Sequence, residues 1–134
     1  MSPDLKSTRP LLDKLGVKSG SRIAVIDLDA KWFLDELRRR TSDVTLGKPR
    51  GKCDLVFYGV NKPADLARLS RLKEWIEPNG AIWAVRQKGP TSPLRDTDLI
   101  EAGLAAGLVD NKIASFSDTH GAMRFVFRLR DRPR

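Results

Sequence analysis

Two patterns of apolar residues alternate along the chain: short continuous runs, and longer stretches with an apolar residue every three or four positions. Continuous runs rich in Val, Ile and aromatic residues are typical of strands that are covered on both faces. Spacings of three and four place apolar side chains on one face of a helix. The runs predict strands over residues 22–27, 43–46, 54–60, 81–85, 112–117 and 123–129. The spacings predict helices over residues 11–15, 29–40, 63–76 and 97–106.

Several residues mark where these helices begin and end. Gly16 follows the first helix, where glycine adopts a left-handed cap without steric cost. We expect Asp29 to cap the second helix, and Pro63 fits the first turn of the third because its missing N–H is not needed there. Residues 78–80, Pro-Asn-Gly, are expected to end the third helix. Trp75 belongs to the apolar stripe of this helix, so we expect its side chain to face the core.

Strands and helices alternate through most of the chain, which implies parallel strands joined by right-handed crossovers. The last two strands are joined by the short turn 118–121 and must therefore be antiparallel. We predict a three-layer α/β fold with a mostly parallel sheet and a C-terminal antiparallel hairpin. The 134 residues correspond to one domain. We therefore expect a single domain over residues 1–134, with residues 1–8 and 131–134 loosely ordered.

The order and spacing of several segments resemble the class I S-adenosylmethionine (SAM) methyltransferases. Residues 15–23 resemble the lead-in to the first strand of that family, and residues 76–83 resemble its turn before a later strand. The closing hairpin matches in kind. Residues 107–112, together with Ser117 and Arg124, further resemble a bacterial family known only as a domain of unknown function. The resemblance implies a methyltransferase-like Rossmann fold and assigns no reaction.

Two features that hold SAM in such folds are missing from the sequence. Adenosyl cofactors lie over a glycine-rich turn after the first strand, at the carboxyl edge of the sheet. The corresponding turn, residues 27–32, contains no glycine, so a Cβ stands wherever the backbone would approach the ligand. No acidic residue follows the second strand to bind the ribose hydroxyls, because residues 45–48 are Thr, Leu, Gly and Lys. The sequence therefore favours a non-catalytic, degenerate methyltransferase-like domain that binds or interacts, without a cofactor.

Two alternative functions stay open. One is a SAM-dependent methyltransferase with an unorthodox cofactor loop, and the other is a weak, sequence-independent nucleic-acid-binding module. The chain has 25 Lys and Arg against 17 Asp and Glu, a net charge of +8. Such an excess favours phosphate-bearing partners through long-range attraction. The partner classes left open are an anionic small molecule, a protein and a nucleic acid.

If the domain binds a ligand, the carboxyl edge of the sheet is the expected place, as in other open α/β sheets. The candidate rim residues at this edge are Asp27, Asp29, Lys31, Asn61 and Lys88. The two lysines would attract an anion, and Trp32 or Tyr58 would stack on a planar group. No residue is assigned a catalytic role.

Metal and nucleophile chemistry have few residues available. His120 is the single histidine and Cys53 the single cysteine, so the chain has no paired imidazoles for a metal and no internal disulfide. A triad of Cys53, Asp118 and His120 is conceivable by composition. A lone cysteine at the start of a strand is, however, more often a buried apolar residue.

Neither a membrane span nor a secretory signal is recognisable. No apolar run approaches the length needed to cross a bilayer, and residues 1–10 mix charge with Ser and Pro. We therefore expect a cytoplasmic protein that does not contact membranes.

Overall fold

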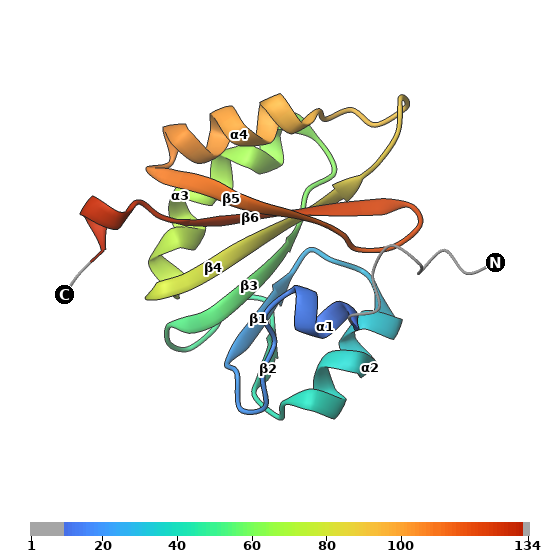
Figure 1. The fold of residues 1–134 in the computed structure, drawn as a ribbon, viewed down its shortest axis with the longest axis vertical. Helices are drawn as coiled ribbons and strands as arrows, with labels where there is room; N and C mark the ends of the chain where they lie inside the picture. The colour runs from blue at the N-terminus through green and yellow to red at the C-terminus, as the bar shows by residue number, and fades with distance from the viewer. Residues whose placement is uncertain (1–9, 133–134) are drawn as a thin grey trace.

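A six-stranded sheet forms the centre of the part of the chain that the computed structural model describes, residues 10–132. The strands lie in the order β2-β1-β3-β4-β6-β5 (Figure 1). Their bounds are β1 Ile23–Ile26, β2 Val44–Leu46, β3 Cys53–Gly59, β4 Ile76–Gln87, β5 Leu108–Ser115 and β6 His120–Phe127. The strands β1 to β4 pair in parallel, and β6 pairs antiparallel with both β4 and β5. The predicted sheet, mostly parallel with a C-terminal antiparallel hairpin, is confirmed.

Helices cover both faces of this sheet. The α-helices are α1 Leu11–Lys14, α2 Lys31–Arg40, α3 Leu69–Leu72 and α4 Asp96–Ala105. Short 3-10 helices add η2 Pro63–Arg68, η3 Lys73–Trp75 and η4 Leu129–Asp131. Figure 1 shows α1 and α2 on one side of the sheet and α3 and α4 on the other. The predicted three-layer arrangement is therefore also confirmed.

Each face of the sheet has its own apolar core. On the side of α3 and α4, Leu69 and Leu99 pack with sheet residues such as Ile82. On the side of α1 and α2, Phe33 packs with sheet residues such as Trp83. β3 and β4 lie inside the sheet and are buried on both faces, which is why their sequences are continuous apolar runs.

The segment predicted as one helix over residues 63–76 differs from the prediction. It forms η2, α3 and η3 in succession, and Ile76 already belongs to β4. Residues 78–80 lie inside β4 instead of ending a helix, at a point where the register between β3 and β4 shifts. Such an irregularity accommodates Pro78, which has no N–H for a regular ladder. Gly80 is needed there because a Cβ would lie 2.9 Å from the Asp54 carbonyl oxygen.

Trp75 is consequently only half-buried, at the end of η3. Its ring packs against the core on the side of α3 and α4, and Lys48 Nζ lies 6.0 Å from the ring centroid. Among the described residues, the largest fully buried side chain is that of Trp83 instead.

Some expectations fall at the ends of the chain. The loose order expected for residues 1–8 and 133–134 concerns positions outside the described residues. Asp131, which was also expected to be loosely ordered, is the last residue of η4. Within residues 10–132, no helix combines the length and the hydropathy that crossing a bilayer requires.

Candidate functional site

An open groove of about 630 Å³ lies at the carboxyl ends of β1, β2 and β3. We call it the β1 groove, because β1 is the middle one of these three strands. It is lined by Val25, Asp27, Leu28, Asp29, Leu46, Gly47, Asn61, Lys62 and Asp65. Open α/β sheets bind ligands at this edge, where loops from neighbouring strands converge. The β1 groove is therefore the candidate site.

Asp27 makes the sharp turn at the end of β1. Its φ of 54° lies in the left-handed region, the only such value for a non-glycine residue among residues 10–132. A side chain in this conformation costs about 1 to 2 kcal/mol, so the surrounding contacts must hold it. One such contact is the ion pair between Asp27 Oδ2 and Arg68 Nη1, at 2.7 Å. Strain of this kind concentrates at functional sites.

Gly59, at the end of β3, provides the close backbone approach in this region. A Cβ at this position would lie 2.1 Å from the Asp27 carbonyl oxygen and 2.9 Å from the Asp27 carbonyl carbon. The sequence suggested that a turn without glycine would be too crowded. The structure shows that Gly59 lets β3 lie directly against the Asp27 carbonyl, and that the groove beside the turn is nevertheless open.

Asp29 does not cap α2 as the sequence predicted. The helix begins at Lys31 with Ala30 at the N-cap position, and no side chain bonds to the first turn. Within residues 10–132 the Asp29 carboxylate makes no hydrogen bond, and its side chain lies in the exposed lining of the groove. Asp29 is therefore free to accept hydrogen bonds from a ligand.

Asp65 closes the far wall of the groove at the start of η2. Its Oδ2 accepts hydrogen bonds from the backbone N–H groups of Asn61 at 2.8 Å and Lys62 at 3.1 Å. These bonds hold the loop after β3 in one conformation, which fixes both Asn61 and Lys62 on the groove wall.

Tyr58 supports this wall from inside the core instead of facing a ligand. Its side chain is fully buried, and its hydroxyl donates to the Asp65 carbonyl oxygen at 2.8 Å. Burial raises the pKa of the phenol, and the Arg68 guanidinium lies 5.5 Å from the ring centroid. The prediction that Tyr58 would stack on a ligand is therefore wrong, since Arg68 and the core occupy its surroundings.

Two of the candidate rim residues lie away from the groove. Lys31 pairs with Asp35 one turn further along α2, with Nζ and Oδ2 at 3.1 Å. Lys88 lies beside a second, smaller pocket of about 250 Å³, and its Nζ donates to Ser115 Oγ and to the Ser117 carbonyl oxygen. The structure brings Asp27, Asp29 and Asn61 together in the β1 groove and separates both lysines from them.

Sequence reasoning missed Gly59, Asp65 and Arg68. Gly59 ends an apolar strand, and such a glycine is a recognisable sign of close backbone approach. Asp65 follows Lys62 at the spacing of a helix-capping pair, which is also recognisable. Arg68 had no local signal, because its partner Asp27 is 41 positions away in the sequence.

The conceivable Cys53, Asp118 and His120 triad is excluded by the strand arrangement. Cys53 is the first residue of β3, at the amino edge of the sheet, and is fully buried. His120 pairs with Gln87 at the carboxyl end of β4, so the two side chains lie at opposite edges. Nor do residues 10–132 bring together three His, Cys, Asp or Glu side chains that could hold a metal ion.

The thiol of Cys53 should be unreactive in the folded protein. Burial raises the pKa of Cys53 to about 11, so at about pH 8 the nucleophilic thiolate is scarce and shielded. Titration with a chromogenic disulfide reagent should show almost no reaction until denaturant is added, with Cys53→Ala as the blank. The pKa of Cys53 is about 11 in the folded protein and about 9 in the unfolded chain, so the unfolded chain releases its proton first as the pH rises. The contribution of Cys53 to folding stability should therefore be lost between about pH 9 and about pH 11. Rapid labelling of the native protein would contradict the burial of Cys53.

Comparison with known proteins extends this description. No family model and no curated protein sequence matches the chain. Among solved structures, a SAM-dependent methyltransferase from Aquifex aeolicus superposes with a TM-score of 0.64 at 14% identity, over 92% of this chain and 93% of that one. LepI in complex with SAM has a TM-score of 0.64 at 14% identity, and the match covers 96% of this chain and 49% of LepI, about half of its length. Aeropyrum pernix fibrillarin with natively bound SAM has a TM-score of 0.55 at 13% identity, over 82% and 68% of the two chains.

These similarities correct the preferred interpretation of the sequence. The interpretation as a non-catalytic, degenerate domain is contradicted, because the similar structures are SAM-dependent or SAM-bound proteins. The absence of glycine from residues 27–32 was given too much weight, since the groove beside that turn is open. At identities this low the likeness concerns architecture. The chain has a methyltransferase-like Rossmann fold.

Proposed function

We propose that the protein is a SAM-dependent methyltransferase with an unorthodox cofactor loop. The observation that carries the proposal is the β1 groove, an open site at the carboxyl ends of three adjacent strands with three carboxylates in its lining. Asp29 has no hydrogen-bond partner among the described residues, and Asp27 and Asp65 are held in fixed positions by Arg68 and by backbone N–H groups.

The chemistry of the groove fits the cofactor. SAM carries hydrogen-bond donors in its ribose hydroxyls and its ammonium group, and these match carboxylate acceptors. Lys62 provides a cation for the carboxylate of the cofactor, and Val25, Leu28 and Leu46 provide apolar surface for its adenine. Leu46 is 57% exposed, so its side chain is available to contact the adenine. Asp29 replaces the acidic residue that is missing after β2.

The groove residues would bind and orient, and the cofactor would supply the reactive group. When bound, SAM provides an electrophilic methyl carbon, which a nucleophile of the acceptor takes up while the bond from that carbon to sulfur breaks. Arg68 holds the Asp27 carboxylate in position at the edge of the groove through the 2.7 Å ion pair. Asp65 keeps the loop after β3 in place, so that Asn61 can donate and accept at the groove wall.

Asp29→Asn should weaken SAM binding about tenfold, because each lost hydrogen bond to a charged group is worth about 1.5 kcal/mol or more. Isothermal titration of the parent with SAM and with S-adenosylhomocysteine should show saturable binding of both. Glu101→Gln is the matched control, since it also neutralises an exposed carboxylate and Glu101 does not line the groove. If the parent shows no saturable binding of either compound up to about 1 mM, the proposal is wrong.

Three further expectations from the sequence belong to this proposal: one domain over residues 1–134, membership of a bacterial family and a cytoplasmic location. The two apolar cores, which run through the whole sheet, support a single domain. The free, buried thiol of Cys53 accords with a reducing compartment.

A further inference from the structure

Arg124, in the middle of β6, has a guanidinium group without a partner among the described residues. Its side chain is only partly exposed, and its Nε is buried without a hydrogen bond to any residue in the range 10–132. Within that same range it is the one buried side-chain nitrogen or oxygen that lacks a partner. Buried polar atoms are almost always hydrogen-bonded, so an exception calls for an explanation such as a bound ion.

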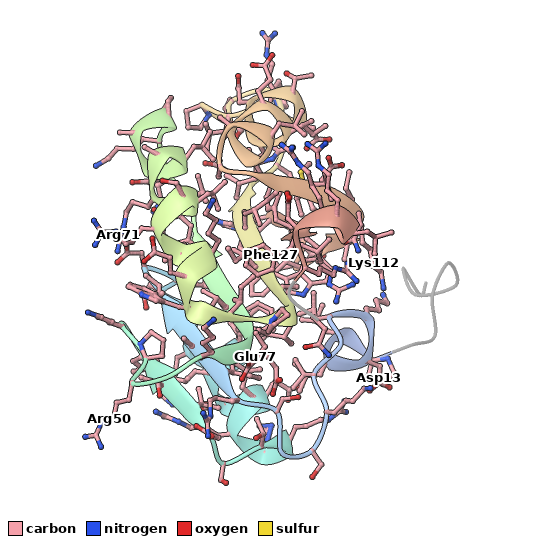
Figure 2. All side chains as sticks on the ribbon, turned by 90° about the vertical axis from the view of Figure 1, so that its left-hand side faces the viewer. Asp13, Arg50, Arg71, Glu77, Lys112 and Phe127 are labelled. Atoms are coloured by element: carbon pink, nitrogen blue, oxygen red, sulfur yellow. The ribbon has the colours of Figure 1, made fainter. Side chains whose placement is uncertain are left out.

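Two other cations, Lys112 and Arg132, lie near Arg124. Lys112 on β5 lies directly opposite Arg124 in the antiparallel register, which places both side chains on one face. Lys112 Nζ donates to the Lys14 carbonyl oxygen at the end of α1, at 2.9 Å, and Figure 2 shows Lys112 above the helix that carries Asp13. Arg132 Nε donates to the Phe127 carbonyl oxygen at 3.3 Å. We call Lys112, Arg124 and Arg132 the β5–β6 cation cluster.

No carboxylate neutralises this cluster within the described part of the chain. Asp13 on α1 bonds to Arg40 at 2.5 Å, and Asp131 lies 3.9 Å from Arg130. Asp110 pairs in register with Phe125, whose ring lies in the core on the other face of the sheet. Burial and the charge of Arg132 both lower the pKa of Arg124. The cluster therefore carries uncompensated positive charge in a partly desolvated place.

We propose that the β5–β6 cation cluster binds a phosphate group. Like charges held together away from water are unfavourable unless an anion joins them. Guanidinium groups present their N–H donors in a fork that matches phosphate oxygens, and a lysine adds a mobile point charge. The unpartnered Arg124 Nε is a donor that no residue in the range 10–132 uses. β4 lies between β6 and the three strands whose ends form the β1 groove, so the site is separate from the proposed methyltransferase site.

A thermal-shift titration with inorganic phosphate tests the site directly. Phosphate should raise the melting temperature of the parent in a saturable way beyond sodium chloride of the same ionic strength, because it binds only the folded state. Arg124→Met, which keeps much of the side-chain volume, should weaken this binding at least about tenfold. Arg50→Gln is the matched control, since Arg50 points outward at the opposite side of the molecule in Figure 2. Equal phosphate binding by all three proteins would overturn the proposal.

The stability of Arg124→Met without phosphate gives a second, independent measurement. If Arg124 is retained for a ligand, removing its unpaired charge should raise the melting temperature by about 3 °C. If Arg124 serves only the packing of the hairpin, the same substitution should lower the melting temperature, and the proposal fails.

Two further ligands distinguish the source of the phosphate group. A nucleoside monophosphate offers a terminal phosphate, whereas a short single-stranded RNA offers phosphodiesters alone. Preferential binding of either ligand that is lost in Arg124→Met and kept in Arg50→Gln supports the site and identifies its source. RNA binding that falls equally in both variants would reflect the overall positive charge of the protein and would overturn the proposal.

Discussion

Gly59→Ala should cost about 3 kcal/mol or more of folding stability, one of the largest effects expected for a single methyl group in this protein. The added Cβ would lie 2.1 Å from the Asp27 carbonyl oxygen, far inside the usual separation of non-bonded atoms. The obstacle is backbone directly after the interior strand β1, so no side chain can rotate out of the way. Urea unfolding followed by circular dichroism measures the loss.

Gly51→Ala is the matched control for this substitution. A Cβ at position 51 meets only Arg22 Nη1, at 3.5 Å, which is ordinary contact with a flexible side chain. We expect this variant to be neutral, or more stable by up to about 1 kcal/mol, because alanine restricts the unfolded chain more than glycine does. Equal stability of the two variants would mean that β1 and β3 do not approach as closely as described.

Trp83→Ala should cost about 3 to 5 kcal/mol, because it empties the centre of the core beneath α1 and α2. Trp83 is fully buried in β4, and its Nε1 donates to the Leu15 carbonyl oxygen at 3.0 Å. The substitution therefore leaves a large cavity and an unpaired carbonyl group at the end of α1. The free energy of unfolding in urea is again the measurement.

Two further variants separate the effect of the lost hydrogen bond from the effect of the lost ring. Trp83→Phe keeps most of the ring and loses the hydrogen bond, so it should cost about 1 to 3 kcal/mol. Trp32→Ala removes a tryptophan that is 46% exposed and packs on Phe116 with ring centroids 5.2 Å apart. It should cost less than half as much as Trp83→Ala. Equal costs for Trp32→Ala and Trp83→Ala would contradict the assignment of Trp83 to the core.

The contrast between Trp75 and Trp83 shows how far the apolar pattern of the sequence predicts the burial of a side chain. Trp75 stands at helical spacing from Leu69 and Leu72, so the sequence predicts a buried face, yet the helix breaks into short pieces and Trp75 is half-buried. Trp83 lies in a continuous apolar run whose depth no local pattern reveals. Burial depends on the position of β4 between β3 and β6, which is set by pairing across the sheet.

The candidate site was predictable in part. Asp27, Asp29 and Asn61 were expected at the carboxyl edge because parallel strands end on the same side of a sheet. Lys88 was expected there for the same reason. Its ammonium instead donates hydrogen bonds to Ser115 Oγ and to the Ser117 carbonyl oxygen, next to the β5–β6 turn. The order of the strands, and the hydrogen bonds that follow from it, decided which residues share a groove.

By itself, the sequence determined the kind and order of nearly all the elements, and hence the three-layer fold. Apolar periodicity and residues such as Gly16, with its φ of 80°, act between neighbours in the chain and can be interpreted locally. Only the tertiary structure decided that Gly59 lies against the Asp27 carbonyl, that Arg68 pairs with Asp27, and that Arg124 lies beside Lys112 without a partner in the range 10–132. These contacts join positions far apart in the sequence, because strand register and packing depend on the whole chain and leave no mark in any one segment.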